Sequence, residues 1–278
     1  MPTQAEKAFA FQALHQRDRA FIIPNPWDVG TALLLAHLGF EALATTSAGY
    51  AFSLGKPDQA VGRDKMMAHV AVISSATDLP VSGDLENGFG DSPETVAETI
   101  RLAADAGLVG GSIEDATGNP DCPLYEFAHA VERVRAAAGA AQALPFPFTL
   151  TARAENFLSG RPDLSDTIRR LQAFQEAGAD VLYAPGLSRL DDIAAVIRSV
   201  DRPVNVLIGF EGGPLNVAEL SALGVRRASV GSGLCRAALS AVLHCAREMR
   251  EHGTFPLPEH PVSYREINEI FAHRKSDS

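Results

Sequence analysis

The sequence predicts an α/β protein, a (β/α)8 TIM barrel with additional helices at its C-terminal end. Eight short apolar runs alternate with longer amphipathic segments along the 278 residues. Each run has the length of a strand that is buried on both faces. Alternating strands and helices form parallel sheets with right-handed crossovers, and eight such units in about 250 residues are typical of this barrel.

The strands are predicted from short runs of β-branched or small residues with helix or turn signals between them. They are residues 21–23, 42–46, 79–82, 109–113, 148–152, 181–183, 204–208 and 228–230. A Rossmann fold is disfavoured because Pro24-Asn25-Pro26 follows the first run, where a dinucleotide-binding fold would have its glycine-rich turn.

Helix signals fill the segments between the runs. Ser92-Pro93-Glu94 supplies an N-cap residue, a proline in the first turn and an early acid, and the helix that follows ends at Gly107. Further helices are expected near residues 163–178 and 191–200. The recurrence of helix, glycine and strand indicates a repeated βα unit.

We expect one domain, because no low-complexity linker divides the chain. The barrel is expected at about residues 18–232 and a C-terminal helical extension at about residues 233–275. Within the extension, two helices are joined by the proline-containing stretch Thr254–Pro261. Such an appendage often packs on a neighbouring subunit, so a homo-oligomer is expected.

The composition excludes several classes of function. The 24 Lys and Arg residues against 34 Asp and Glu give a net charge of −10, which argues against a nucleic-acid-binding surface. Three cysteines without a CxxC spacing argue against a disulfide framework or a structural zinc site. The most apolar stretch, residues 30–52, is interrupted by His37 and Glu41, so no membrane span is expected. We therefore expect a cytoplasmic protein with no membrane partner.

Acidic side chains and one arginine follow the predicted strands at the barrel end that carries active sites. Asp84 and Glu86 follow the third strand, Glu114 the fourth and Arg153 the fifth. Crowded carboxylates repel one another, and a divalent cation is the usual remedy. Each acid alone could instead cap a helix or pair with an arginine, as Glu155 could with Arg153. The combination on one face favours a functional site, with Mg²⁺ near Asp84 and Glu86.

Five motifs occur in a characteristic order. They are Asn25-Pro26-Trp27-Asp28, Thr45-Thr46-Ser47-Ala48 followed by Leu54-Gly55-Lys56-Pro57-Asp58, Gly83-Asp84-Leu85-Glu86-Asn87-Gly88-Phe89-Gly90, Ser112-Ile113-Glu114-Asp115, and Thr151-Ala152-Arg153. With these motifs, the chain resembles the isocitrate lyase/phosphoenolpyruvate mutase superfamily over nearly its full length. The superfamily commonly has Asp where Glu86 stands.

The resemblance implies a barrel whose C-terminal helix is exchanged between subunits, commonly in a tetramer built as a dimer of dimers. It implies Mg²⁺ or Mn²⁺ near Asp84, with Glu86 and Glu114 in direct or water-mediated support. The small anionic substrate would be a 2-oxo acid or its enolate. Its carboxylate or phosphonate would be held by Thr46, Ser47 and Ala48.

By the same resemblance, Arg153 would clamp a carboxylate and Asp58 would lie beside the reacting centre. Trp27 would either line the pocket or fill its rim. Arg226 and Arg227 are interpreted as a solvated or interface pair rather than an anion site.

The loop after the fourth strand departs from the superfamily pattern. Lyase members carry K-[KR]-C-G-H there, whereas this loop, Ala116–Leu124, has Cys122 at about the right distance but none of its flanking residues. Cys122 is therefore either the catalytic acid or an incidental loop residue. The second interpretation is open because the basic residues that would activate the thiol are missing beside it. Asn119 is the loop residue considered for a polar clamp. A substrate-binding Glu is also absent after the sixth strand, which argues against tricarboxylate substrates.

The first functional hypothesis is a Mg²⁺-dependent lyase or decarboxylase. It would cleave a C–C bond in a small 2-oxo or 2-hydroxy carboxylic acid through a metal-stabilised pyruvate enolate. The alternative enzyme would act on a P–C bond, as a phosphonomutase or a phosphonopyruvate hydrolase does. A third hypothesis is a non-catalytic member that binds a 2-oxo acid.

Overall fold

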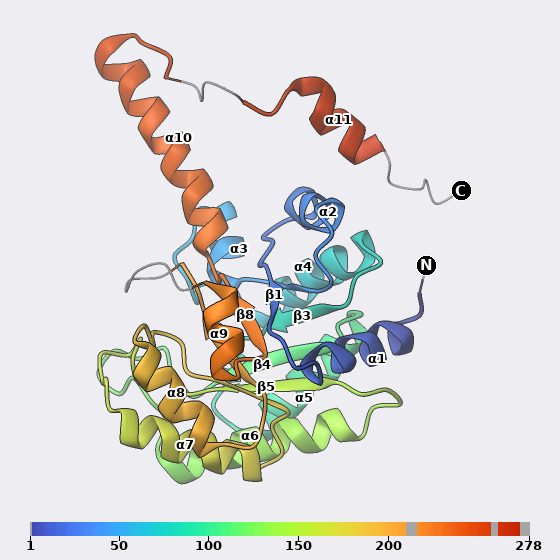
Figure 1. Ribbon diagram of the computed structural model, residues 1–278, viewed down its shortest axis with the longest axis vertical. Coiled ribbons are helices and arrows are strands. Elements are labelled where there is room, and N and C mark those ends of the chain that lie inside the picture. The colour runs from blue at the N-terminus through green and yellow to red at the C-terminus, as the bar shows by residue number, and fades with distance from the viewer. Residues whose placement is uncertain (1, 210–215, 257–260, 273–278) are drawn as a thin grey trace.

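A computed structural model describes residues 2–209, 216–256 and 261–272 (Figure 1). The eight strands are β1 (Phe21–Ile23), β2 (Leu43–Ala44), β3 (Val81–Asp84), β4 (Gly110–Glu114), β5 (Thr149–Arg153), β6 (Val181–Tyr183), β7 (Val204–Leu207) and β8 (Arg227–Ser229). All neighbouring strands are parallel, in the order β1-β8-β7-β6-β5-β4-β3-β2. The amide of Ala44 donates to the carbonyl of Pro24 across the remaining gap, at 3.1 Å. The predicted (β/α)8 barrel is confirmed, with nearly complete closure.

Helices connect the strands and cover the outside of the barrel (Figure 1). Those in the described residues are α1 (Gln4–His15), α2 (Val29–His37), α3 (Ser47–Ser53), α4 (Arg63–Ala76), α5 (Pro93–Asp105), α6 (Phe127–Gln142), α7 (Leu164–Glu176), α8 (Leu190–Ser199), α9 (Val217–Leu223), α10 (Gly233–His252) and α11 (Tyr264–Ala272). The Ser92 hydroxyl accepts from the Thr95 amide at 3.2 Å and begins α5 as predicted. Gly107, with φ +92°, lies just past its end and takes a conformation that favours glycine.

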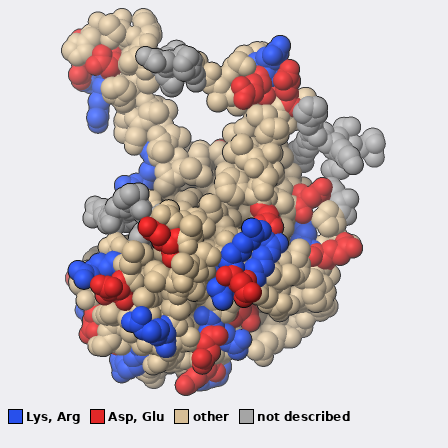
Figure 2. All heavy atoms as spheres, in the orientation of Figure 1, with Lys and Arg blue, Asp and Glu red and all other residues tan. Residues whose placement is uncertain are grey.

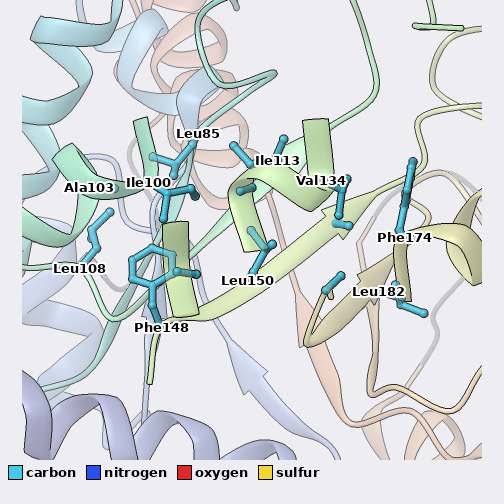
Figure 3. Packing of buried hydrophobic residues seen from close by; sticks show 14 of the residues in the cluster. Leu85, Ile100, Ala103, Leu108, Ile113, Val134, Phe148, Leu150, Phe174 and Leu182 are labelled. Atoms are coloured by element: carbon cyan, nitrogen blue, oxygen red, sulfur yellow. The ribbon is translucent and has the colours of Figure 1, made fainter. Parts of the chain in front are cut away.

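Apolar side chains fill the space between the strands and the outer helices. Figure 3 shows Leu150 of β5 and Ile113 of β4 among the side chains of this cluster, with Ile100 of α5 and Val134 of α6. A second cluster, which includes Phe11 of α1, lies against the amino ends of the strands. Helix α1 therefore closes the barrel at the end opposite the predicted site.

The interior of the barrel is polar rather than filled with branched apolar residues. Because side chains alternate along a strand, residues two apart face the same side. Ser82 and Asp84 of β3, and Ser112 and Glu114 of β4, line one internal cavity. Polar interior positions thus leave a chamber where many barrels have a packed core.

The C-terminal helices stand away from the barrel, with α10 projecting from it and α11 lying near α2 (Figure 1). Exposed apolar side chains on them include Val242 and Leu243 of α10 and Tyr264 of α11. On the face in Figure 2, the middle of α10 is largely uncharged. Two helices in this extension were predicted and are present. Parts of the predicted connection and of its end, 257–260 and 273–275, lie outside the described residues. No helix in the described part is long and apolar enough to cross a bilayer.

Replacing Leu150 with Ala should lower the free energy of unfolding by about 2–5 kcal/mol, because the side chain is 1% exposed and its removal leaves a cavity. The matched control is Leu38→Ala, at a position that is 71% exposed, where a change within about 0.5 kcal/mol is expected. Urea denaturation of both variants measures the difference. Equal losses would contradict this description of the core.

Candidate active site

A cavity of about 330 Å³ opens at the carboxyl ends of the barrel strands and extends into the barrel. It brings together most of the residues that the sequence indicated, from four strands and the loops that follow them. Its lining includes Thr46, Ser47, Ala48, Asp58, Asp84, Glu86, Glu114 and Arg153. Residues far apart in the sequence therefore form one site, as the barrel topology requires.

Negative charge is in excess around this cavity. The lining includes five carboxylates, those of Asp58, Asp84, Glu86, Glu114 and Glu155, against the two guanidinium groups of Arg153 and Arg227. Burial, together with the charges of neighbouring acids, raises the pKa of Glu114 well above its usual value, although Arg153 opposes the shift. Such a cluster favours either bound protons or a bound cation.

Arg153 lies at the centre of the carboxylates. Its Nη1 atom is 2.9 Å from Asp84 Oδ1, its Nη2 atom 3.0 Å from Glu114 Oε2, and its Nε atom 2.7 Å from Glu155 Oε1. Burial lowers the pKa of Arg153, but the charges of Glu155, Glu114 and Asp84 outweigh burial and raise it well above its usual value. The alternative that Glu155 pairs with Arg153 is thus observed. All three guanidinium nitrogens are engaged by protein carboxylates.

The loop after β2 is held against Asp84. The backbone amide and the hydroxyl of Ser47 donate to Asp84 Oδ2 at 3.0 and 2.9 Å, and the Asp84 amide donates to Thr45 Oγ1 at 2.9 Å. The Thr46 hydroxyl accepts from the Gly49 amide at 3.2 Å and caps α3. The predicted anion-binding donors of Ser47 therefore orient the central carboxylate in this state.

Glu86 is placed by a turn with an unusual backbone. Its φ is +49°, in the left-handed region that non-glycine residues rarely adopt. Its Oε1 atom is buried and, in the described structure, accepts no hydrogen bond. Burial and the charges of Asp84 and Asp58 raise the pKa of Glu86 to about 8. A buried acceptor without a donor is suited to a proton or a cation.

Asp58 lies at the mouth of the cavity beside Gln59. The Asp58 Oδ1 atom accepts from the Gln59 amide at 2.9 Å and lies 3.3 Å from the Ser47 hydroxyl. Partial burial and the charge of Asp84 raise the pKa of Asp58. Gln59, with φ +62°, donates from Nε2 to Glu114 Oε1 at 3.3 Å. Sequence reasoning missed Gln59, and only its place next to Asp58 could have indicated it.

A buried arginine outside the cavity fixes the turn that carries Glu86. Arg133 of α6 donates to the backbone carbonyls of Asn87, Gly90 and Asp91 and lies over the Tyr125 ring at 4.0 Å. These bonds hold the loop that follows β3. Sequence reasoning missed this role, because a lone arginine in a helix carries no signal of such distant contacts.

Asp115, next to Glu114, faces away from the cavity. Its Oδ1 atom accepts from the Glu155 amide at 2.8 Å, and its Oδ2 atom lies 3.0 Å from Arg170 Nη1 of α7. Asp115 therefore joins β4 to the segment after β5 and to a helix. Its role here is to position Glu155.

Three predicted residues do not line the described cavity. Trp27 lies where α2 begins, with its backbone amide 3.2 Å from the Thr31 hydroxyl. Asn119 accepts from the Asp121 amide at 3.0 Å within its own loop. Cys122 is exposed, with its Sγ atom 3.8 Å from the Leu124 carbonyl oxygen. Their functional roles stay predictions.

The interpretation of Arg227 as a solvated or interface residue is wrong. Arg227 is 5% exposed, lies in β8 and lines the cavity. The error has a physical reason: side chains alternate along a strand, so only one of two adjacent arginines points outward. Arg226 is the outer one, donating to the Asp18 carbonyl at 3.4 Å.

The donor set fits a hard divalent cation. Asp84, Glu86 and Glu114 offer carboxylate oxygens, and the buried Oε1 atom of Glu86 accepts no hydrogen bond from the described residues. In the described residues, no three His, Cys, Asp or Glu side chains form a direct metal-binding group. Mg²⁺ keeps several water ligands and takes only one or two protein carboxylates, so direct convergence of three is not required.

Comparison with known proteins places this chain in a family. The phosphoenolpyruvate phosphomutase family matches residues 11–250. A Burkholderia cenocepacia J2315 crystal structure, considered a lyase or mutase, is 64% identical over 97% of this chain and 96% of its own, with a TM-score of 0.94. A phosphonopyruvate hydrolase complex with oxalate and Mg²⁺ is 25% identical over 96% and 95%, with a TM-score of 0.82.

Two relatives of known activity also match. The 2-methylisocitrate lyase of Escherichia coli is 29% identical and covers 88% of this chain and 85% of its own length. The oxaloacetate decarboxylase of Chromohalobacter salexigens is 28% identical, covering 90% and 88%. The chain belongs to the phosphoenolpyruvate phosphomutase family, within the isocitrate lyase/phosphoenolpyruvate mutase superfamily. The predicted resemblance to this superfamily is confirmed. The prediction of an enzyme of the isocitrate lyase/phosphoenolpyruvate mutase type is also confirmed.

The raised pKa of Glu86 predicts a pH-dependent stability. The folded protein holds this proton more tightly than the unfolded chain, so the contribution of Glu86 favours folding at low pH and is lost as pH rises toward about 8. We compare the melting temperature of Glu86→Gln with that of the unmodified protein in metal-free buffer. The variant's value relative to the unmodified protein should rise by at least about 3 °C when the pH is raised from 5 to 9. Thermal unfolding across this range measures it. A difference that does not change with pH would refute the assignment.

Proposed function

We propose that this protein is a Mg²⁺-dependent lyase or decarboxylase that cleaves a C–C bond in a small 2-oxo or 2-hydroxy carboxylic acid. The observation that carries the proposal is the carboxylate cluster around Asp84, with its excess of negative charge at the active-site end of the barrel. The 2-methylisocitrate lyase and oxaloacetate decarboxylase relatives support this reaction class.

Asp84, Glu86 and Glu114 would hold the cation, directly or through water. When bound, Mg²⁺ or Mn²⁺ would act as a Lewis acid that withdraws electrons from the oxo acid and so stabilises negative charge at its C3 carbon. The Mg²⁺ complex of phosphonopyruvate hydrolase supports a cation in this fold. A cation would also relieve the repulsion that raises the pKa values of Glu86 and Glu114.

The loop after β2 and strand β5 would bind the substrate. The hydroxyls of Thr46 and Ser47 and the backbone of Ala48 would donate to a substrate carboxylate, and Arg153 would orient it by charge. Both roles require the donors to exchange partners, because Ser47 and Arg153 now bind protein carboxylates. A cation held by Asp84 and its neighbouring acids would take up part of their negative charge and so free these donors for the substrate.

Asp58 is proposed to move the proton. Its Oδ1 atom is engaged by Gln59 and Ser47, which leaves Oδ2, within the described structure, to exchange a proton with the C3 carbon of the cleaved fragment. Its raised pKa makes the carboxyl a better proton carrier near neutral pH.

Breaking a bond at C3 leaves an enolate whether carbon or phosphorus departs. P–C chemistry on a phosphonopyruvate-like substrate is therefore the second candidate, supported by the phosphomutase family match and by the phosphonopyruvate hydrolase neighbour. In that reaction Asn119, in the loop Ala116–Leu124, would be the polar residue that clamps the substrate. Binding of a 2-oxo acid without turnover would identify a non-catalytic member.

We also propose that the protein is a homo-oligomer, a dimer of dimers in which the C-terminal helices are exchanged. The exposed apolar side chains of α10 and α11, such as Val242, Leu243 and Tyr264, support a second copy as their partner.

Replacing Asp84 with Asn should lower kcat/KM by at least about 100-fold, because it removes the central charge of the cation site. The assay would follow oxaloacetate, methylisocitrate and phosphonopyruvate with Mg²⁺, after EDTA treatment and after Mg²⁺ is restored. Calorimetry would show weaker Mg²⁺ binding by the variant. Full activity in Asp84→Asn, or turnover of none of the three substrates by Mg²⁺-loaded protein, would count against the proposal.

Replacing Cys122 with Ala tests the lyase-type thiol. The side chain is exposed and its loop lacks the basic residues of lyase members, so kcat/KM should stay within about twofold. Steady-state rates on the substrate found above measure this. A loss of about 100-fold or more would identify Cys122 as the general acid.

A further inference from the structure

The floor of the cavity holds a buried cation that has no acidic partner among the described residues. Arg227 of β8 is 5% exposed and lines the cavity. Its described partners are neutral: Nε donates to Asn205 Oδ1 at 2.9 Å, and Nη2 donates to Thr151 Oγ1 at 3.0 Å. Nη1 lies 3.4 Å from His15 Nε2. The described residues thus use three of the five N–H donors of Arg227 and leave two for a ligand.

His15 is an acceptor toward Arg227, not a second cation. Its Nδ1 atom lies 2.9 Å from the Phe11 carbonyl oxygen and must donate there, so Nε2 carries the lone pair that faces Arg227. Burial and the charge of Arg227 lower the pKa of His15 to about 3. Burial also lowers the pKa of Arg227, to about 10, which leaves the guanidinium charged at neutral pH.

The two cavity arginines differ sharply in their surroundings. Arg153 is paired with three carboxylates, whereas no described carboxylate lies within ion-pair distance of Arg227. An uncompensated buried charge costs several kcal/mol. An anionic ligand group would supply the missing charge.

The two arginines also lie at different depths. Arg227 binds Thr151, which precedes Arg153 by two residues on β5, and two residues of a strand span about 6.6 Å. The cavity therefore has an acidic mouth around Asp84 and a basic floor at Arg227. A ligand that meets both needs an anionic group several ångströms beyond its reacting end.

We propose that Arg227 binds the distal carboxylate of a dicarboxylic 2-oxo acid and so selects dianionic over monoanionic substrates. This inference rests on the proposed function, in which the 2-oxo carboxylate end lies at the Asp84 cluster. The distal carboxylate accepts from the two N–H donors of Arg227 that the protein leaves unused.

The wild-type protein provides the first test. 2-Oxoglutarate and 2-oxopentanoate have the same chain length and differ only in the distal carboxylate. With Mg²⁺ present, calorimetry should show that 2-oxoglutarate binds about 10- to 100-fold more tightly. Equal affinity, or no binding of 2-oxoglutarate, would overturn the proposal without any variant.

Variants locate the effect. Arg227→Met should reduce the preference for 2-oxoglutarate to less than about threefold while leaving 2-oxopentanoate binding unchanged, and Arg227→Lys should retain part of the preference. The control Arg226→Met removes the same charge one residue away and should keep the full preference. If Arg227→Met fails to fold, the lysine variant and the wild-type pair still decide the matter. A preference unchanged in Arg227→Lys and Arg227→Met would assign Arg227 a purely structural role.

The two proposals fail separately. Tight 2-oxoglutarate binding that depends on Arg227, without turnover of any 2-oxo acid, supports the basic floor and contradicts the proposed enzyme. Turnover of a 2-oxo acid with no dependence on a distal carboxylate supports the enzyme and contradicts the role of Arg227.

Discussion

The ion pairs between Arg153 and its three carboxylates are the interaction on which the site depends. Glu114 and Arg153 are direct neighbours in the register of β4 and β5, and Asp84 and Glu155 reach the same guanidinium from β3 and from the segment after β5. The Arg153 guanidinium thus gathers two buried acids, Glu114 and Glu155, and the partly buried Asp84, which would otherwise repel one another. Among the described residues that line the cavity, five carboxylates still exceed two arginines, and a divalent cation would balance this excess.

The surrounding fold keeps these charges in place. Arg133 holds the carbonyls of the turn that carries Glu86, and Asp115 holds the backbone amide of Glu155. Polar side chains inside the barrel leave room for a ligand and separate the acidic mouth from Arg227. The cavity is acidic at its mouth and basic at its floor. A substrate with two different ends would therefore bind in one orientation.

The barrel and most of the acidic residues at the mouth of the cavity could be predicted from the sequence. Glycines at helix ends and the alternation of runs give the βα unit, and the positions of Asp84, Glu86, Glu114 and Arg153 follow from strand ends. The sequence did not predict which side chains contact one another, because the strand register and the side that each residue faces are set only by the folded structure. Arg227 was misjudged for this reason, because its neighbour Arg226 points outward. The third strand spans Val81–Asp84, so both of its ends lie two residues later than predicted.

The central claim is that the Asp84 cluster binds a divalent cation. Anomalous X-ray scattering from crystals grown with Mn²⁺ tests it most directly, because the signal locates the metal independently of any assay. We expect one peak among the carboxylates of Asp84, Glu86 and Glu114, at direct or water-bridged distance. A peak elsewhere, or none while Arg153 keeps its three ion pairs, would contradict the account.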